Sequence, residues 1–337
     1  MKKILFLMAT AVSSLGIAQA NLDDLFAAGI DDAQRFTNDY LAPVSESVVY
    51  SISNGWYNSA KAKPLGGFEI SIIGNITGFK NKDDKTSFVL NTAEYENLQF
   101  VDGETSKSVS TALGDIEGVR AFVEVEVAPG VTERQEFELP TGLLAEGLNF
   151  MPSGYLQGSV GLIKGLEVKA RFLPKIDTDD VKIGLFGAGL QYDFTSSLPA
   201  DKLLPVAISG VIGYTSLTGE YDFTDAGLFD GDRQIIDTKF SSWTFNAVAS
   251  TRLPVINFYG GLGYVTGKST TDVLGDYTVG VGPLSTTETD PFSISRNVSG
   301  VTANVGTKLK LGFFRLNVDY TLAEFNTLTA GINFGFR

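Results

Sequence analysis

The stretch TLTAGINFGF, residues 327–336, almost ends the chain, with only Arg337 after it. Apolar residues alternate along it with small or polar ones, and this period of two predicts a β-strand with two different faces. The apolar face consists of Leu328, Ala330, Ile332, Phe334 and Phe336. A strand of this kind fits a sheet whose apolar side meets lipid, and it fits the core of a soluble β-sandwich equally well.

The N-terminus, residues 1–20, predicts a secretory signal peptide. Lys2 and Lys3 precede an apolar run over 4–17, and Ala18-Gln19-Ala20 forms a small-residue cleavage site. An uncleaved anchor helix is the alternative, but the apolar run is short for one. We therefore expect export through the Sec pathway. No cysteine follows the run, which excludes a bacterial lipoprotein.

Composition excludes several classes of protein. The 337 residues contain no cysteine and no histidine, which excludes disulfides, a Ser-His-Asp triad and a histidine-ligated zinc site. The net charge of −13 argues against nucleic acid as a partner, because binding to phosphates needs clusters of lysine and arginine. We expect neither an enzyme nor a cofactor or metal site. After the signal peptide no run approaches the ~20 apolar residues of a spanning helix, so a membrane-spanning chain must form a closed barrel.

Residues 21–66 differ from the rest of the chain and predict a short N-terminal helical plug. Apolar residues recur there at spacings of three and four, which is typical of an amphipathic helix. They are Leu22, Phe26, Ile30, Ala33, Phe36 and Tyr40. Pro43 is expected to stop or restart this helix, with a second short helix over 44–52. A small capping domain is the alternative to a plug.

Asn54-Gly55-Trp56-Tyr57 is the most distinctive motif outside the strands. It predicts a turn whose aromatic side chains dock the helical segment. The alternative is a ligand site between plug and wall, with an apolar lining that Trp56 and Tyr57 form together with Phe26 and Phe36.

Residues 67–337 predict an all-β fold, a transmembrane antiparallel β-barrel of about 12–14 strands, including one possible hairpin within 80–118. Three tight turns, at 164–165, 253–254 and 312–313, contrast with long acidic loops at 217–236 and 269–292. Short turns at one end and long loops at the other are typical of outer-membrane barrels.

The strand over 327–336 is then expected to close the barrel. Its partners would be the strand over 313–323 and the first strand, near 68–79. Its aromatic residues Phe334 and Phe336 would lie at the periplasmic interface and serve as the assembly signal.

Charged residues alternate along two consecutive strands and are predicted to face the barrel lumen, where they would tune selectivity. They are Arg120, Glu124, Glu126, Arg134, Glu136 and Glu138. The alternative is a solvated or ion-paired surface that contributes little. Glycines at 184–189 and 260–263 lack the strand-loop-helix context of a phosphate site, so we expect them to ease close packing or leave space in the lumen.

A signal peptide, a helical segment and a long antiparallel series together resemble the FadL-type fatty-acid and hydrocarbon transporters of the outer membrane. The resemblance implies an N-terminal hatch in a barrel and lateral exit of hydrophobic ligands into the bilayer. The Asn-Pro-Ala hatch motif of that family is absent here. More closely, NGWYNSAK at 54–61, LGGFEISI at 65–72 and LTAGINFGFR at 328–337 resemble uncharacterised barrels of Bacteroidota-type bacteria.

The predicted function is passive uptake of small hydrophobic molecules, such as fatty acids, through a barrel in the bacterial outer membrane. The expected partners are outer-membrane lipid, the barrel-assembly machinery and a small hydrophobic ligand. The alternative is a structural or adhesive barrel, without transport, whose acidic loops contact partners or divalent ions outside the cell.

Overall fold

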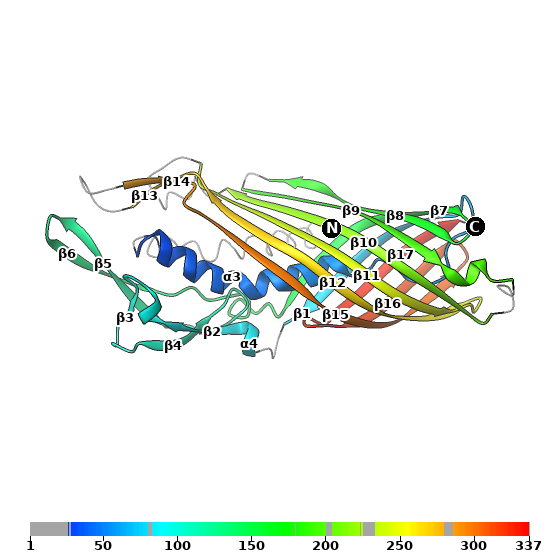
Figure 1. Cartoon of the computed structure of the whole chain (residues 1–337), viewed down its shortest axis with the longest axis horizontal. Helices are drawn as coiled ribbons and strands as arrows, with labels where there is room; N and C mark the ends of the chain where they lie inside the picture. The colour runs from blue at the N-terminus through cyan, green and yellow to red at the C-terminus, as the bar shows by residue number, and fades with distance from the viewer. Residues whose placement is uncertain are drawn as a thin grey trace.

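The computed structural model describes residues 26, 28–79, 83–178, 180–199, 204–222, 224, 233–279 and 286–336, so the predicted signal peptide lies outside the described residues. In this part of the chain ten antiparallel strands close into a barrel in the order β1-β17-β16-β15-β12-β11-β10-β9-β8-β7 (Figure 1). The strands are β1 (Phe68–Gly78), β7 (Phe150–Ile163), β8 (Leu166–Asp177), β9 (Val181–Asp193), β10 (Val206–Asp222), β11 (Ile235–Thr251), β12 (Ile256–Leu274), β15 (Phe292–Leu311), β16 (Phe314–Leu322) and β17 (Thr327–Phe336). The predicted antiparallel barrel is confirmed, whereas the predicted number of about 12–14 strands was wrong.

The last strand closes the barrel, as its alternating pattern predicted. β17 pairs with β16 on one side and with β1 on the other, where Phe336 lies opposite Phe68. The rings of these two residues stack with centroids 5.0 Å apart. Phe334 and Phe336 therefore lie on the outer surface beside the start of β1.

The two ends of the barrel differ in their connections. At the short-turn end the strands are joined by residues 164–165, 194–205, 252–255 and 312–313, and β17 ends there. At the long-loop end lie residues 79–149 and the small hairpin of β13 (Asp276–Val279) and β14 (Thr286–Thr289). The tight turns predicted at 164–165, 253–254 and 312–313 are confirmed.

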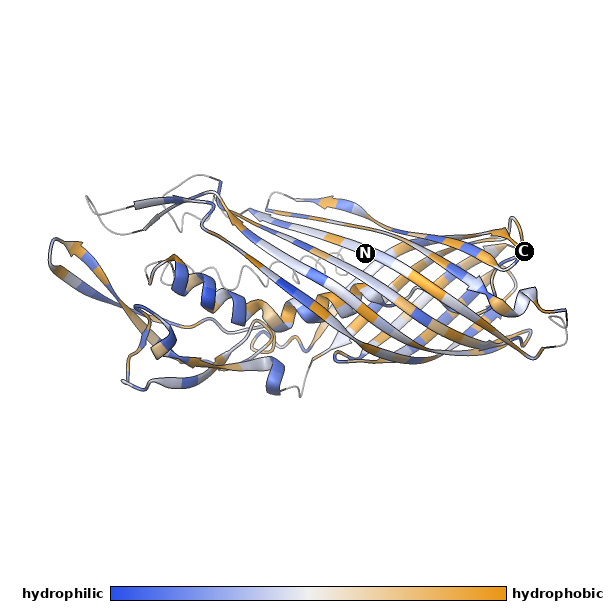
Figure 2. Ribbon diagram, viewed as in Figure 1, coloured by the Kyte–Doolittle hydropathy of each residue, from blue (hydrophilic) through white to orange (hydrophobic). Residues whose placement is uncertain are grey.

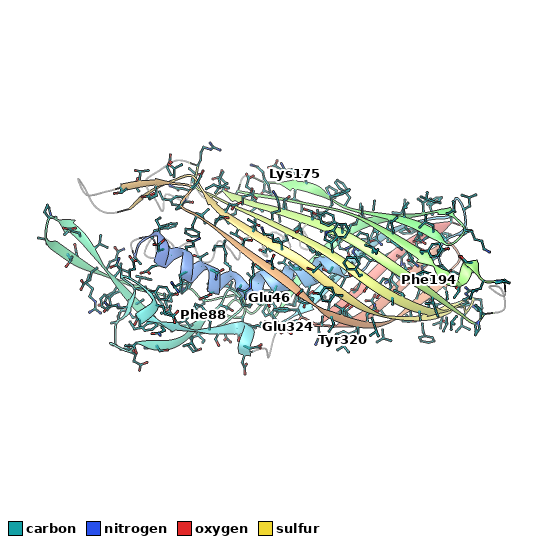
Figure 3. All side chains as sticks on the ribbon, viewed as in Figure 1. Glu46, Phe88, Lys175, Phe194, Tyr320 and Glu324 are labelled. Atoms are coloured by element: carbon teal, nitrogen blue, oxygen red, sulfur yellow. The ribbon has the colours of Figure 1, made fainter. Side chains whose placement is uncertain are left out.

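The barrel wall is apolar outside and polar inside. Ile70, Phe186 and Leu262 are more than half exposed on the outer face, to which Phe194 and Tyr320 in Figure 3 also belong. On the inner face of β8, by contrast, Glu167, Lys169 and Arg171 are buried. The same alternation is visible along the strands in Figure 2. A closed sheet with an apolar exterior and a polar interior is the arrangement of an outer-membrane β-barrel.

Several strands are longer than predicted. β12 has 19 residues and β15 has 20, whereas ~9–11 residues suffice to cross a membrane. The segments 217–236 and 269–292, predicted as loops, begin and end as continuations of strands. Beyond the bilayer a strand no longer needs an apolar outer face, so the alternation fades there although the ladder continues.

Residues 79–149 form two small sheets outside the barrel. The elements are α4 (Asp83–Thr86), β2 (Ser87–Asn91), η2 (Thr92–Glu94), β3 (Gln99–Phe100), β4 (Ser106–Ser110), β5 (Arg120–Ala128) and β6 (Val131–Glu138). β2 pairs with β4, and β5 pairs with β3 and β6. The hairpin expected within 80–118 is therefore present as β2 and β4, but it is not part of the barrel.

The charges of β5 and β6 do not face the lumen, which corrects the prediction for Arg120, Glu124, Glu126, Arg134, Glu136 and Glu138. These strands project from the long-loop end (Figure 1). Arg120 and Arg134 pair with Glu136 at 2.8 and 3.0 Å on an accessible surface. Alternating charge marks one face of a strand pair and does not distinguish a lumen from bulk water, so the solvated alternative is correct.

A single helix, α3 (Ile30–Ser53), runs from the long-loop end into the barrel (Figure 1). Pro43 lies inside this continuous helix, so the prediction that it stops or restarts the helix was wrong. Proline removes one helical hydrogen bond, but the residues on both sides of Pro43, from Tyr40 to Ser45, are buried, and this packing holds the axis in place. In the part of the chain that the structure describes, no helix is both long and apolar enough to span a membrane.

The outer half of α3 is covered by residues 79–149. The buried carboxylate of Asp32 accepts hydrogen bonds from the backbone N–H groups of Glu96, Asn97 and Leu98 at 2.9–3.2 Å. The backbone N–H of Ala112 donates to the carbonyl oxygen of Tyr40 at 2.9 Å. Residues 79–149, which we call the outer insertion, therefore cap the long-loop end around α3.

Candidate functional site

The predicted ligand and plug residues fall into two separate groups. Phe26 stacks on Tyr277 of β13 at 5.0 Å, and Phe36 packs against Tyr40 and Phe88 at the long-loop end. Asn54, Trp56 and Tyr57 follow the end of α3 inside the barrel. The structure therefore does not bring the four aromatic residues together, and the alternative of one shared aromatic site was wrong.

Trp56 fills the middle of the lumen. It is 1% exposed, and the guanidinium carbon of Arg171 on β8 lies 3.5 Å from its ring centroid and 4.2 Å from that of Tyr155. The same guanidinium donates to the carbonyl oxygen of Ile52 at 2.9 Å and to Gln157 Oε1 at 3.0 Å. This buried cation is thus held by two aromatic faces and neutral oxygens, which bind α3 to the wall.

Glycines in the wall make room for the plug, as predicted. A Cβ atom on Gly189 of β9 would lie 2.6 Å from the indole of Trp56, and one on Gly213 of β10 would lie 2.3 Å from it. A Cβ atom on Gly261 of β12 would lie 2.5 Å from the hydroxyl oxygen of Tyr57. Any larger residue at these positions would displace the aromatic side chains.

Polar contacts complete the docking of the motif. Tyr57 Oη donates to Asn304 Oδ1 at 2.9 Å, and Tyr155 Oη donates to the carbonyl oxygen of Asn54 at 2.5 Å. Asn54 Nδ2 in turn donates to the carbonyl oxygen of Tyr50 at 2.8 Å. The motif at 54–57 is therefore the point where the plug is fixed, as its docking interpretation predicted.

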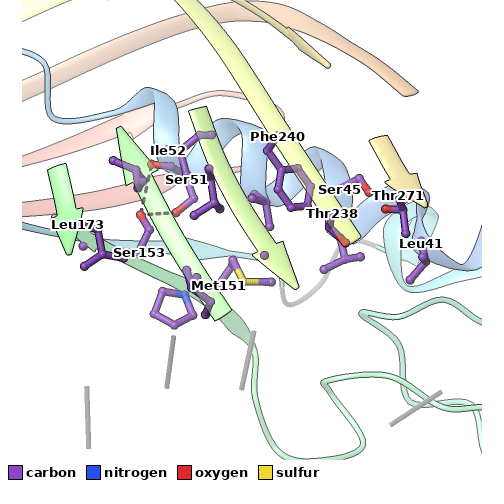
Figure 4. Close-up of a pocket in the computed structure, with 18 residues that line it drawn as sticks. Leu41, Ser45, Ser51, Ile52, Met151, Ser153, Leu173, Thr238, Phe240 and Thr271 are labelled. Carbon is purple, nitrogen blue, oxygen red and sulfur yellow. Dashed lines mark hydrogen bonds between the residues drawn. The ribbon is translucent and has the colours of Figure 1, made fainter. Parts of the chain in front are cut away.

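An apolar cavity lies between α3 and the wall, on the long-loop side of the motif at 54–57 (Figure 4). From α3 it is lined by Leu41, Val44, Val48 and Ile52, and from the wall by Met151, Leu173, Ile183, Leu185, Leu217 and Phe240. Its volume is about 60 Å³. An engineered cavity of roughly 150 Å³ takes up benzene, so a bulky ligand needs the lining to move.

One polar group in this cavity has no hydrogen-bond partner. The hydroxyl of Thr238 on β11 is buried, and among the described residues nothing bonds to it. The three serine hydroxyl groups of the lining are paired: Ser51 Oγ donates to Ser153 Oγ at 2.8 Å, and Ser45 Oγ accepts from Ser269 Oγ at 3.3 Å. Burying a hydroxyl without a partner is unfavourable, so Thr238 is suited to bond the polar end of a ligand.

The hydrogen-bond ladder of the barrel wall has a gap beside this cavity. β7 and β8 pair from the short-turn end up to Leu156 and Phe172, and no ladder pair joins them beyond that point in the described strands. Residues 150–155 of β7 then pair with β1 alone. Each strand carries a proline here, Pro152 and Pro174, which has no N–H to donate to a ladder. Met151 to Gly154 and Leu173 line the cavity from the two sides of the gap.

Sequence reasoning did not identify this cavity, although a signal for it is present. Along β9, Ile183 and Leu185 are buried in the lumen, whereas Phe186 and Leu190 are exposed on the outer face. The apolar alternation therefore changes phase between 185 and 186. A change of phase within one unbroken strand means that the apolar face turns from lipid to lumen.

A network of ion pairs lies in the lumen at the short-turn end. Glu69 of β1 pairs with Lys308 at 3.1 Å and with Arg315 at 2.7 Å. Glu167 of β8 pairs with Lys169 at 2.7 Å and with Lys63 at 2.9 Å. Only Lys63 belongs to the plug, so its pair with Glu167 joins the plug to the wall at the end opposite the apolar cavity, and the other three pairs lie within the wall.

Comparison with solved structures gives distant likenesses to outer-membrane barrels. The attachment invasion locus protein Ail of Yersinia pestis, solved with the heparin analogue sucrose octasulfate, is 10% identical with a TM-score of 0.29, covering 81% of this chain and 100% of that one. The outer membrane protease OmpT of Escherichia coli is 8% identical with a TM-score of 0.32, covering 82% and 100%. The translocator domain of the autotransporter NalP of Neisseria meningitidis is 10% identical with a TM-score of 0.29, covering 90% and 97%.

Sequence comparison gives a family. No curated protein matches the chain. The model described as "Family of unknown function (DUF6588)" matches residues 1–336. This match extends over the barrel, the plug and the outer insertion together. The chain therefore belongs to the DUF6588 family, whose function is unknown.

Proposed function

We propose that this protein is a passive, non-enzymatic channel of the outer membrane that takes up small hydrophobic molecules, with fatty acids as one class. The observation that carries the proposal is the apolar cavity between α3 and the wall, placed where β7 and β8 part. The FadL-type resemblance of the sequence agrees with it. By the usual orientation of such barrels, the short-turn end is periplasmic.

The cavity has the chemistry that an amphipathic ligand needs. Apolar side chains of valine, leucine, isoleucine, methionine, proline and phenylalanine make up most of its lining, and burying an apolar chain against them is favourable by about 25 cal/mol per Å². The free hydroxyl of Thr238 supplies one bond for a polar head. Binding sites for small molecules combine these two features.

The gap between β7 and β8 gives such a ligand a route through the wall. On the long-loop side of the gap, residues 79–149 cover α3. On the short-turn side, Trp56 and Arg171 fill the lumen. The strands themselves leave Met151 to Gly154 unpaired on the β8 side. A ligand that leaves through this gap arrives beside the apolar outer face rather than in water.

A disulfide across the gap tests the route, because the chain has no cysteine of its own. Continuing the β7–β8 register would place Gly154 opposite Pro174, so a disulfide between Gly154→Cys and Pro174→Cys would draw the two strands together and close the gap. Uptake of a labelled fatty acid by cells that express the oxidised variant should fall to that of cells without the protein. Reduction of the disulfide should restore it.

A second cysteine pair is the control. Gly158 and Ala170 are opposite each other in the paired part of the same strands. A disulfide between Gly158→Cys and Ala170→Cys should leave uptake unchanged in both redox states. Wild-type uptake by the oxidised Gly154→Cys, Pro174→Cys variant would refute the proposed route, and absence of uptake by the wild type would refute the function.

The remaining expectations belong to the same proposal. Phe334 and Phe336, on the outer face beside β1, would be read by the barrel-assembly machinery. Outer-membrane lipid would contact the apolar exterior, after export of the chain through the Sec pathway. Truncating Phe336 and Arg337 should lower the amount of heat-modifiable barrel in outer-membrane fractions, and an unchanged amount would argue against this signal.

A further inference from the structure

A second cavity lies at the short-turn end, and its lining is strongly basic. It measures about 290 Å³ and is lined by the plug segment 58–64 and the ends of β8, β9, β11, β15 and β16. Five lysines, two arginines and one glutamate line it. The whole chain, by contrast, carries a net charge of −13. The concentration of cations here is therefore not a consequence of composition.

The buried charges in this cavity do not balance. Four cations, Lys63, Lys169, Lys308 and Arg315, share the two carboxylates of Glu69 and Glu167 at 2.7–3.7 Å. Lys169 and Lys308 are both less than 9% exposed. An excess of charge out of contact with water is unfavourable, and either an opposite charge joins it or one of the groups gives up its proton.

Two more lysines are outside this network. In the described residues, neither Lys61 nor Lys310 pairs with a carboxylate, and the ammonium of Lys310 reaches only the carbonyl oxygen of Leu253 at 3.4 Å. Lys61 is exposed at the cavity mouth. Glu69 and Glu167 therefore pair with the four cations of the network and, within the described part of the chain, with neither of these two lysines.

Arg252 adds to the same surface and is held in place by the loop beside it. One of its guanidinium nitrogens donates to Thr195 Oγ1 at 2.7 Å, and Asp193 binds Thr195 in turn at 2.5 Å. A hollow lined mainly by charges of one sign, between low-dielectric walls, concentrates its field and raises the local concentration of counterions. The arrangement is open at one end and positive within.

We propose that this cavity binds a small oxyanion, of the phosphate or carboxylate class. Lysine and arginine are the side chains that bind such groups, through charge-assisted hydrogen bonds. At ~30 Å³ per water molecule, the cavity has room for one such anion with part of its hydration shell. This site is independent of the proposed hydrophobic channel, because it lies on the other side of Trp56.

Titration of the purified full-length protein with inorganic phosphate tests the proposal. The measurement is isothermal calorimetry at low ionic strength in an uncharged detergent. The double variant Lys61→Gln, Lys310→Gln should bind phosphate about tenfold more weakly for each lysine removed, which is the loss of one charge-assisted hydrogen bond. Neither lysine belongs to the ion-pair network of Glu69 and Glu167, so the heat-modifiable mobility of the barrel should be unchanged.

Lys164 provides a matched control, since it is exposed in the β7–β8 turn at the same end but does not line the cavity. Lys164→Gln should bind phosphate as the wild type does. Equal binding by the wild type and the double variant, or absence of binding by the wild type, would overturn the proposal.

A repeat titration with phosphatidylglycerol in the micelles identifies the source of the anion. Displacement of phosphate by the lipid would assign the site to a headgroup of the inner leaflet, and unaltered binding would assign it to a free anion. Both results support the site. Neither depends on uptake of hydrophobic molecules, so failure of this proposal is distinguishable from failure of the proposed function.

Discussion

Two halves of the lumen hold the same plug by different interactions. We call the half toward the long-loop end the outer half and the half toward the short-turn end the inner half. In the outer half, Val44 and Val48 of α3 face Leu185 and Phe240 across the apolar cavity. In the inner half, Lys63 reaches Glu167 through an ion pair at 2.9 Å and a backbone hydrogen bond at 3.0 Å. Apolar contact is non-directional and survives a small shift, whereas a buried ion pair keeps its partners at one distance. Movement of the plug should therefore begin in the outer half, beside the gap in the wall.

The largest loss of stability is expected from breaking the ion-pair network of the inner half. Glu69→Gln removes the carboxylate that Lys308 and Arg315 share and leaves these cations without their partner. Breaking a buried pair on one side costs about 3–5 kcal/mol. The free energy of unfolding, measured by guanidinium titration in lipid vesicles, should fall by this amount.

An accessible ion pair outside the barrel is the control for that loss. Glu136→Gln breaks the pairs with Arg120 and Arg134 on β5 and β6. Exposed pairs contribute about 0–1 kcal/mol, so this variant should unfold almost as the wild type does. Equal losses in the two variants would mean that the inner network does not anchor the plug.

The main features of the barrel were predictable from sequence because they are local. Alternation along 327–336 identified the closing strand. Turns at 164–165 and 312–313 fixed which strands are neighbours. Each of these signals extends over fewer than about twenty residues, the length of one hairpin.

The strand number and the site were not predictable in the same way, because they depend on distant pairings. β5 and β6 alternate as barrel strands do, but β7 rather than β5 pairs with β1. The motif at 54–57 predicted docked aromatic residues, but not that Trp56 would meet Arg171. No pattern within either segment links residues more than 100 positions apart. The phase change along β9 and the two prolines were local signals of the cavity that sequence reasoning did not use.

An intermediate effect is expected where the two halves meet. Gly213→Val would place side-chain atoms in the volume of Trp56, since even a Cβ there lies 2.3 Å from the indole. Overpacking of this kind costs about 1–3 kcal/mol. The variant should loosen Trp56 and make it accessible to acrylamide, read by fluorescence quenching in a Trp243→Phe background, because the chain has two tryptophans.

Gly74→Val is the matched control, because a Cβ at Gly74 meets no atom within 4 Å. Quenching of Trp56 should then equal that of the Trp243→Phe protein. If Gly213→Val also left quenching unchanged, Trp56 would not be the contact that separates the two halves, and both halves of the plug would move together.

The smallest effect is expected within the outer half itself. Thr238→Val replaces the unpartnered hydroxyl by a methyl group of similar size, which removes the cost of burying it. The free energy of unfolding should rise by about 1 kcal/mol. If the cavity takes amphipathic ligands as proposed, the same variant should bind a fatty acid more weakly and an alkane of equal length as before.

Thr244→Val on the same strand should change the free energy of unfolding in the opposite direction. Thr244 is also buried and faces inward, but its Oγ1 accepts a hydrogen bond from Asn246 Nδ2 at 2.9 Å. Removing that acceptor should lower stability by about 1 kcal/mol. Two identical substitutions on one strand would then differ in sign, because the hydroxyl beside the apolar cavity has no partner whereas the hydroxyl further down the lumen has one. A loss of stability in both variants would show that the hydroxyl of Thr238 is already satisfied, and would remove the polar anchor from the proposed site.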